Sequence, residues 1–342
     1  MNTNSIHFKV KAMNFETFIG IDVSKKTFDV VLRTATNPSQ HTQYSNDEQG
    51  ITALLQDLKQ AKVKLTGSLI CLEHTGIYTH LLLKLLYAKK ANLWLEQPLS
   101  IKRSLGIQRG KNDKVDAARI AEYADRFQDK AVLWKPARQE VLRLNGLIKL
   151  RDRLIKAKKM LATPVKEMAE VGVTGKNELK ALTGPVLAQL NTVEQHIEAL
   201  IGDDAHLQRL QAIITSVDGV GKVTAWQMIV TTNEFQDFTD SRKFACFSGV
   251  VPFDHSSGTS VYARPRVSHM ANKRMKELLH MSALSATTMK KSDLNVYYQR
   301  KVAEGKNKML VLNNIRNKIV QRVFACVKDN RKYEKNYAHA LA

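Results

Sequence analysis

The chain has 342 residues, enough for two or more domains that each bury a core of their own. Its 53 lysines and arginines outnumber 32 acidic residues, which gives a formal net charge of +21 at pH 7. Such a surplus favours a polyanionic partner, because bound phosphates offset the self-repulsion of the protein. No apolar stretch approaches the roughly 18 residues of a membrane span, and no signal peptide is evident, so we expect no membrane association.

The basic surplus is uneven along the chain. Residues 1–130 hold 19 basic and 13 acidic residues, a net of +6, whereas residues 131–342 hold 34 and 19, a net of +15. We therefore expect most of the electrostatic attraction for a polyanion in the second part. Cys71, Cys246 and Cys326 lie far apart in apolar runs, which predicts core residues of a reduced, cytoplasmic protein and no zinc site.

Residues 16–130 follow an N-terminal extension (1–15) and alternate between strand-like and helix-like hydrophobic periods. Helices are predicted after Asn46, Pro98 and Asn112. The other predicted elements are, in order, strands over Phe18–Val23, Thr27–Thr34 and His41–Ser45, a strand ending at Glu73, a helix over Tyr78–Ala88 and a strand over Asn92–Leu95. The order βββαβαβα predicts an α/β domain of the RNase H-like type.

Four carboxylates fall at the ends of these elements. Asp22 and Glu73 each end an apolar strand, and Asp113 and Asp116 open a helix with a spacing that puts both on one face. Converging carboxylates repel one another unless a cation lies between them. Mg²⁺, with Mn²⁺ as a substitute, is the hard cation that suits such ligands and supports phosphoryl transfer.

Each carboxylate also has a structural interpretation. Asp113 could cap the helix together with Asp116, and Asp22 could open a turn. An acidic residue at the end of a buried strand is costly, however, and here it occurs twice in one domain. Taken together, the four residues favour a metal site.

Residues 131–205 are predicted to form a helical arm. One long helix over residues 137–163 is expected to be limited by Pro164, and a second carries a short heptad of apolar residues between Leu179 and Leu200. Val171–Lys176 is the expected link between them. The pattern predicts a helical hairpin or a coiled coil, and it leaves packing within the chain and pairing between chains equally open.

Residues 206–342 contain two further motifs. A helix, the turn Gly219-Val220-Gly221 and a helix that begins near Lys222 predict a helix-hairpin-helix, whose backbone N–H groups could bind a phosphate. An ordinary turn between two helices is the alternative.

The second motif is a Ser/Gly-rich loop that includes Ser256, Ser257, Gly258 and Ser260. A hydroxyl on such a loop could attack a phosphate, and nearby cations could neutralise the charge that develops. A surface turn is the commoner explanation of this composition. Residues that could bind nucleic acid beside the loop are Arg264, Arg266, Lys273 and Arg274.

Six segments in this order resemble the DEDD transposases of bacterial insertion sequences, family number 110. The resemblance covers nearly the whole chain. The segments are Gly20–Lys25, Glu73–Tyr78, Lys111–Ala117, Gly219–Gly221, Phe244–Pro252 and His255–Gly258. One departure is Val267–Arg274, where relatives commonly have a glycine and this chain has Asn272, which can also adopt a positive φ.

The resemblance implies a RuvC-like N-terminal domain (16–130), a coiled-coil arm (131–205) and a mainly α C-terminal transposase domain (206–342). It makes Asp22, Glu73, Asp113 and Asp116 the metal ligands. Ser257 becomes the nucleophile, with Ser256 and Ser260 as fallbacks. It further implies recombination of donor and target DNA guided by a structured bridge RNA, by a homo-oligomer (a dimer or tetramer) acting at the bacterial nucleoid.

The leading hypothesis is therefore a transposase or recombinase that uses a serine–phosphate intermediate. A metal-dependent nuclease or Holliday-junction resolvase, in which water attacks, is the alternative. A catalytically silent nucleic-acid-binding protein is a third hypothesis, which the presence of all four carboxylates and the serine disfavours.

Overall fold

The computed structural model describes residues 15–34, 40–74, 76–104, 106, 113–172, 175–257, 261–268 and 270–335. The chain forms two compact units, Met1–Pro136 and Ala137–Ala342. The first holds a mixed α/β sheet and the second is mostly helical. Within the described ranges, no helix has the length and apolarity needed to cross a membrane.

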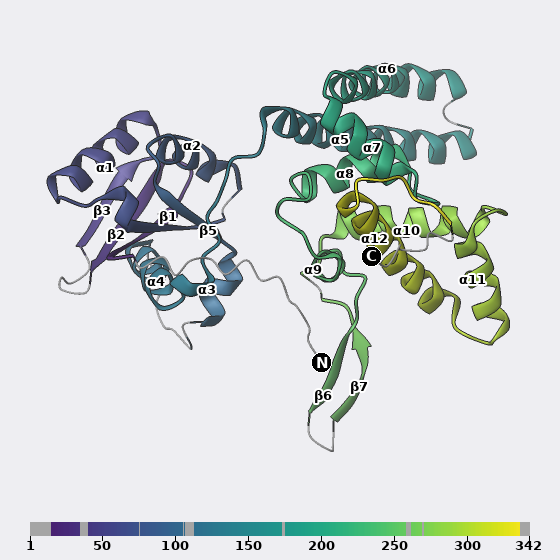
Figure 1. Cartoon of the computed structure of the whole chain (residues 1–342). Helices are drawn as coiled ribbons and strands as arrows, with labels where there is room; N and C mark the ends of the chain where they lie inside the picture. The colour runs from purple at the N-terminus through teal and green to yellow at the C-terminus, as the bar shows by residue number, and fades with distance from the viewer. Residues whose placement is uncertain are drawn as a thin grey trace. The chain divides into compact units, whose positions relative to one another are not determined.

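The first unit is built on a five-stranded sheet with the order β3-β2-β1-β4-β5 (Figure 1). β1, β2 and β3 are antiparallel neighbours, whereas β4 and β5 run parallel to β1. The central strands are almost fully buried because helices cover both of their faces. The strands are β1 (Thr17–Val23), β2 (Thr27–Thr34), β3 (Gln40–Ser45), β4 (Ser68–Glu73) and β5 (Asn92–Glu96).

Two helices pack on each face of this sheet. α1 and α2 cover one face through a mainly aliphatic core, and α3 and α4 cover the other around Trp94 and Tyr123 (Figure 1). The side chain of Asp47 caps α1 by accepting a hydrogen bond from the Gly50 N–H. The helices of this unit are α1 (Glu48–Gln60), α2 (His80–Ala88), α3 (Pro98–Ser104) and α4 (Asp113–Arg126).

A glycine sets how closely α4 approaches the sheet. A Cβ atom on Gly20 would lie 2.2 Å from both the Ala117 carbonyl oxygen and the Ala121 nitrogen. Only a residue without a side chain therefore lets α4 lie directly on β1. Arg33 on β2 fixes the other end of the helix through a 2.8 Å contact with Asp125. The first turn of α4 consequently lies toward the end of β1 that carries Asp22.

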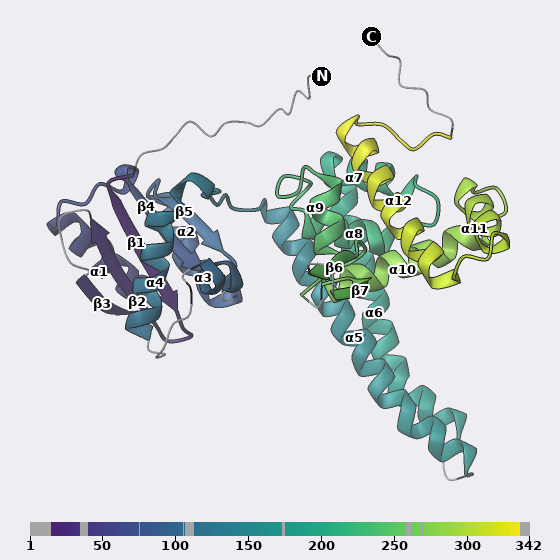
Figure 2. The ribbon, with the colours of Figure 1, turned by 90° about the horizontal axis from the view of Figure 1, so that it is seen from below.

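The second unit begins with two long helices, α5 (Gln139–Glu170) and α6 (Lys176–Gly202), which pack along each other (Figure 2). Six shorter helices share one apolar core with the start of α5 and the end of α6. They are α7 (Ala205–Thr215), α8 (Lys222–Thr231), α9 (Ser241–Phe247), α10 (Lys273–Thr288), α11 (Asp293–Ala303) and α12 (Lys308–Lys328).

Two predictions for the second unit were wrong. Pro164 does not end the first long helix, because α5 continues to Glu170. A proline inside a helix costs about 3 kcal/mol, and α6 carries one as well at Pro185. Packing of the two helices along their length offsets this cost. Ser256 and Ser257 do not lie in a loop either, since they end β6 (Phe253–Ser257), which pairs with β7 (Val261–Arg266).

Candidate active site

Acidic residues follow one another across the face of the sheet that α4 covers. Side chains alternate along a strand, so Asp22 shares this face with Gly20, and Glu73 shares it with Cys71, which packs against α4. Asp29 pairs with Asp22 across β2 and β1. The neighbouring registers Ile21↔Leu72 and Glu73↔Glu96 extend the same row to β4 and β5. Four adjacent strands thus each contribute one carboxylate.

The first turn of α4 adds two more carboxylates. Asp113 is the first residue of the helix and Asp116 lies one turn further along, where its Oδ1 accepts a 2.7 Å hydrogen bond from Arg119. The positive end of the helix dipole stabilises the negative charges of both side chains. The close packing of α4 at Gly20 brings this turn to the acidic face of the sheet.

The electrostatics of Asp22 link all four predicted site residues. Burial, and then the charges of Glu73, Asp116, Asp113 and Asp29, raise the pKa of Asp22 to about 6. Each of these causes disfavours a charged carboxylate. The structure therefore brings Glu73, Asp113 and Asp116 within electrostatic reach of Asp22.

Sequence reasoning missed Asp29 and Glu96. Asp29 is only 4% exposed, and it accepts hydrogen bonds from His41 at 2.7 Å and Gln43 at 3.1 Å, both on β3. Glu96 accepts a 3.2 Å hydrogen bond from the Tyr123 hydroxyl. The position of Asp29 within the otherwise apolar run of β2 could have indicated a functional role.

A hard divalent cation suits the oxygen donors of this face. No three acidic, histidine or cysteine side chains of the described residues lie close enough to enclose an ion as they stand. The carboxylates are neighbours on one face of the sheet and do not form a closed cage. The raised pKa of Asp22 is the observation that fits a cation, because a positive charge there would relieve this repulsion.

Ser257 is the last residue of β6, and its backbone pairs with Val261 of β7. The hairpin projects from the helices of the second unit (Figure 1). The side chains of Ser256, Ser257 and Arg264 lie outside the described part of the structure, as do Gly258, Ser260 and His269 entirely. The choice of nucleophile therefore stays a prediction.

The Gly219-Val220-Gly221 turn joins α7 to α8. Gly219 has a φ of +82°, and a Cβ atom there would lie 2.3 Å from the Ser282 carbonyl oxygen of α10. Gly219 is thus required for close packing, whereas a Cβ atom on Gly221 would meet no atom within 4 Å. Lys222 pairs with Glu198 at 2.7 Å. Phosphate binding by this turn stays a prediction.

The predicted basic residues near the hairpin differ in their surroundings. Arg274 reaches Asp152 of α5 at 2.7 Å and Glu277 at 3.1 Å, so it ties α10 to α5. Lys273 and Arg266 are exposed. Of the three, only Lys273 and Arg266 are therefore presented to solvent for contact with a polyanion.

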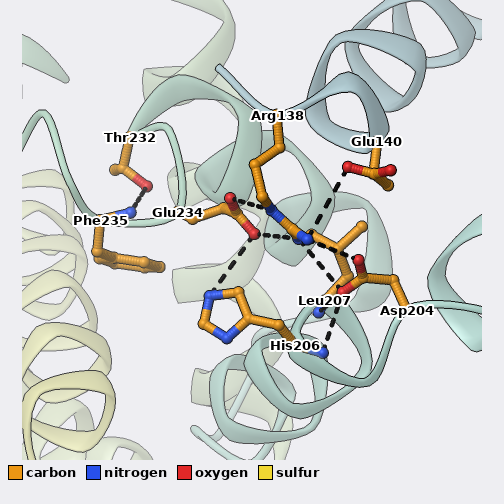
Figure 3. Close-up of polar contacts among 8 residues, drawn as sticks. All are labelled: Arg138, Glu140, Asp204, His206, Leu207, Thr232, Glu234 and Phe235. Carbon is orange, nitrogen blue, oxygen red and sulfur yellow. Dashed lines mark hydrogen bonds and ion pairs between the residues drawn. The ribbon is translucent and has the colours of Figure 1, made fainter. Parts of the chain in front are cut away.

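A second acidic cluster lies in the other unit, around Arg138 at the start of α5 (Figure 3). Arg138 donates two hydrogen bonds to Glu234, at 2.9 and 2.7 Å, and one of 2.8 Å to Asp204. The Glu234 side chain is only 1% exposed. Hydrogen bonding to Arg138 lowers the pKa of Asp204 to about 2. This cluster was not predicted, and its compensated charges indicate a structural role.

The first unit has an acidic face that suits a metal ion, and the second unit carries most of the basic surplus, which suits phosphates. These two features together are typical of an enzyme that acts on nucleic acid. Two family models match this chain. A transposase model of the DEDD type covers residues 19–168, and the model of the transposase IS116/IS110/IS902 family covers residues 211–299. Together they span more than two thirds of the chain. The chain belongs to this family of insertion-sequence transposases and is an enzyme that acts on DNA, as the resemblance predicted.

Similar proteins carry names of the same kind. The pilin gene-inverting protein of Moraxella bovis is 24% identical over 330 residues, which cover 94% of this chain and 98% of that protein. The transposase for insertion sequence element IS1111A of Coxiella burnetii is 26% identical over 227 residues, 52% of this chain and 61% of that one. An insertion element IS110 protein of Streptomyces coelicolor is 23% identical over 234 residues, 67% and 56% of the two chains.

Proposed function

We propose that this transposase cuts and rejoins DNA through a serine–phosphate intermediate, at a Mg²⁺ site formed by Asp22, Glu73, Asp113 and Asp116. The observation that carries the metal site is the placement of these acids on one face of the sheet and in the first turn of α4, and the raised pKa of Asp22, which has the other three carboxylates among its causes, supports it. A carboxyl whose pKa is raised by burial and by neighbouring charges is a candidate for a catalytic site.

The first unit is proposed to be an RNase H-like domain of the RuvC type. Its elements follow the order β1-β2-β3-α1-β4-α2-β5 and then α3 and α4, which is the order that the sequence prediction relied on. Such an arrangement gathers the ends of β1 and β4 beside the first turn of α4. Acids at these positions would then serve one site.

Asp22, Glu73, Asp113 and Asp116 would hold the metal through their carboxylate oxygens, with Mn²⁺ as a substitute for Mg²⁺. When bound, a divalent cation supplies charge stabilisation for the oxygens of a phosphoryl group in transfer. Asp29, held by His41 and Gln43, would add negative potential behind Asp22. Arg119 would orient Asp116.

The Ser257 oxygen would attack the DNA phosphorus and form a P–O bond, while the bond from phosphorus to the departing nucleoside oxygen breaks. The serine proton leaves to solvent, and a proton is taken up by the departing oxygen. A hydroxyl of the second DNA strand then displaces the serine, so the number of phosphodiester bonds is conserved. Ser256 and Ser260 are the fallback nucleophiles.

The name of the pilin gene-inverting protein favours this reaction over the alternative. Inverting a gene requires that cut ends be rejoined, whereas a nuclease or junction resolvase that uses water leaves hydrolysed ends. The likeness to that protein extends over 94% of this chain. We therefore favour a recombinase.

Sequence specificity would come from a bridge RNA. The surplus of +21 suits contacts with phosphates, which position a nucleic acid but do not specify its sequence. Base pairing through a bound RNA would supply the specificity. The basic residues of the arm (131–205) and of the C-terminal domain (206–342), with a helix-hairpin-helix at Gly219 and Gly221, would hold RNA and DNA. Pairing of arms as a coiled coil would give a dimer or tetramer.

The proposal is tested by trapping a covalent protein–DNA adduct on DNA that carries the ends of the element. Ser257→Ala should abolish the adduct and recombination while DNA affinity stays nearly unchanged, since a neutral hydroxyl contributes little to phosphate binding. Ser256→Ala is the matched control and should retain the adduct. Loss of the adduct in Ser256→Ala alone would move the nucleophile by one residue, and an adduct retained in both variants would move it to Ser260. DNA cleavage by wild-type protein without any adduct would favour the nuclease.

RNA guidance has a separate test. RNA-free protein should bind DNA weakly, without site preference and with a steep salt dependence. Adding the noncoding RNA that flanks the gene should create site selectivity, and changing its target-pairing loop should redirect the site. Site-selective recombination by RNA-free protein would contradict a guided mechanism.

A further inference from the structure

A polar chain of residues on α12 and α10 holds the backbone from which the β6–β7 hairpin starts. Asn313 on α12 donates a 2.8 Å hydrogen bond from Nδ2 to the carbonyl oxygen of Val250, three residues before β6 begins. Arg316, one helical turn further on, donates from Nη1 to Asn313 Oδ1 at 3.5 Å and from Nη2 to His280 Nδ1 at 3.0 Å. The chain thus runs from α10 through α12 to the foot of the hairpin.

Arg316 is an unusual residue to find in such a place. It is only 6% exposed, its Nε is buried without a hydrogen-bond partner, and no acidic side chain of the described residues pairs with it. A buried guanidinium without a counter-charge costs free energy. No ion pair within the described ranges offsets that cost. The role of Arg316 must therefore lie in its contacts with Asn313 and His280.

The donor-only chemistry of Arg316 orients its neighbours. A guanidinium has five N–H donors and no acceptor. Asn313 must therefore turn its oxygen toward Arg316, which leaves its NH₂ group to donate to Val250. In the same way His280 must present an unprotonated Nδ1. Burial and the charge of Arg316 lower the pKa of His280, which agrees with that neutral form.

The same stretch of backbone is also held by the residues just before α10. The Asn272 N–H donates to the Phe247 carbonyl oxygen at 2.8 Å. Gly249 has a φ of +65°, and a Cβ atom there would lie 2.5 Å from the Ala271 Cβ. Residues 247–250 are therefore fixed between α9, the start of α10 and α12, and the polypeptide enters β6 at Phe253 directly afterwards.

We propose that Asn313 is a positioning residue for the nucleophilic serine: its hydrogen bond to Val250, oriented by Arg316, fixes the foot of β6 and so sets where Ser257 is presented. This inference rests on the proposed function of Ser257. Asn313 acts through the backbone and touches no reacting atom. Displacement of a reacting group by about 1 Å can cost about a hundredfold in rate.

Asn313→Asp separates positioning from stability. The new carboxylate would gain an ion pair with Arg316 but could no longer donate to Val250. We expect unchanged or higher thermal stability, unchanged DNA affinity, and a tenfold to hundredfold slower formation of the serine adduct. Asn314→Asp makes the same change in charge at the next, exposed position of α12 and should alter the adduct rate less than twofold.

Adduct formation by a folded Asn313→Asp variant at the wild-type rate would overturn the proposal. If that variant fails to fold, Arg316→Gln decides, because a neutral amide no longer forces the orientation of Asn313. Slower adduct formation in folded Arg316→Gln supports positioning, and a wild-type rate refutes it.

Hydrogen exchange at residues 253–257 gives a readout that does not depend on chemistry. Faster amide exchange of β6 in Asn313→Asp than in Asn314→Asp supports the positioning of the hairpin, and equal exchange contradicts it. If wild-type protein recombines DNA without any adduct, the proposed serine mechanism is wrong. The exchange test still shows in that case whether Asn313 fixes the position of β6.

Discussion

Two acidic clusters in this molecule show opposite electrostatic behaviour. On the sheet of the first unit, burial and neighbouring carboxylates raise the pKa of Asp22 to about 6. At the start of α5, hydrogen bonds from Arg138 lower the pKa of Asp204 to about 2. Both clusters gather acids from distant parts of the chain, but Arg138 compensates the charges of the second cluster within the protein.

The two directions of pKa shift distinguish acids whose charge stabilises the fold from acids whose charge is not compensated within the protein. Glu234 and Asp204 are held by one guanidinium, so their charges contribute to the native state. Asp22 is destabilised by its neighbours when charged. A protein that retains such a face gives up stability there, and binding of a cation would restore it.

Asp113→Asn should have the largest effect on activity. An amide keeps the volume of the side chain but removes one negative charge from the acidic face. We expect about a thousandfold slower strand cleavage in Mg²⁺, which corresponds to several kcal/mol of lost transition-state stabilisation, with the fold intact. A cleavage assay with matched circular dichroism spectra measures both, and a near wild-type rate would contradict the assignment of this ligand.

Arg138→Met should have the largest effect on stability. The substitution leaves Glu234 buried without its cation, and breaking a buried pair in this way costs about 3–5 kcal/mol. Urea unfolding measures the loss. Arg300→Met is a control, since the Arg300 side chain is 65% exposed and its contact with Glu304 is 3.8 Å long, so its loss should cost under about 1 kcal/mol. Equal losses of unfolding free energy in the two variants would contradict a structural role of the Arg138 cluster.

The effect of Asp22→Asn on the pH dependence of stability should be of intermediate size. A carboxyl with a raised pKa in the folded state contributes stability that is fully present below about pH 4 and is lost as the pH rises through about 6. The asparagine variant escapes this loss. Its stability relative to wild type, measured by urea unfolding without divalent cations, should grow between pH 4 and 6 by about 1–2 kcal/mol and then level off. A difference that is constant with pH would show that Asp22 is not destabilised by its neighbours.

Lys222→Ala should have the smallest effect. Lys222 and Glu198 are each about half exposed, so their ion pair should contribute under about 1 kcal/mol. If the turn at Gly221 binds a phosphate, the salt dependence of DNA binding should fall by about one unit of slope. An unchanged slope would leave the turn with a packing role alone.

The sequence was sufficient to predict the strands of the first unit and the acids at the ends of β1 and β4. Apolar runs bounded by Asp22 and Glu73 mark β1 and β4, and hydrophobic periodicity marks the helices. Asp29 and Glu96 were missed because they join the acidic face through strand register, which depends on pairing between distant residues.

The Arg138 cluster shows the same limit more strongly. Arg138 lies 66 residues from Asp204 and 96 from Glu234 along the chain, and no local pattern links them. The cluster of serine and glycine at residues 256–260 predicts a loop, and it hides the strand pairing of β6 with β7, which depends on residues on both sides of the cluster. The sequence does not reveal that a Cβ atom on Gly219 would meet the Ser282 carbonyl oxygen of α10, because this close approach depends on how distant helices pack.

Thermal unfolding with and without Mg²⁺ tests the central claim most directly, namely that the acidic face of the first unit is a cation site. Wild-type protein at pH 8 should gain several degrees in Tm on addition of Mg²⁺. Asp22→Asn should lose most of this gain, whereas Asp57→Asn, the same charge change on α1 at the other face of the sheet, should keep it. A gain that is absent from wild type, or equal in all three proteins, would contradict the account.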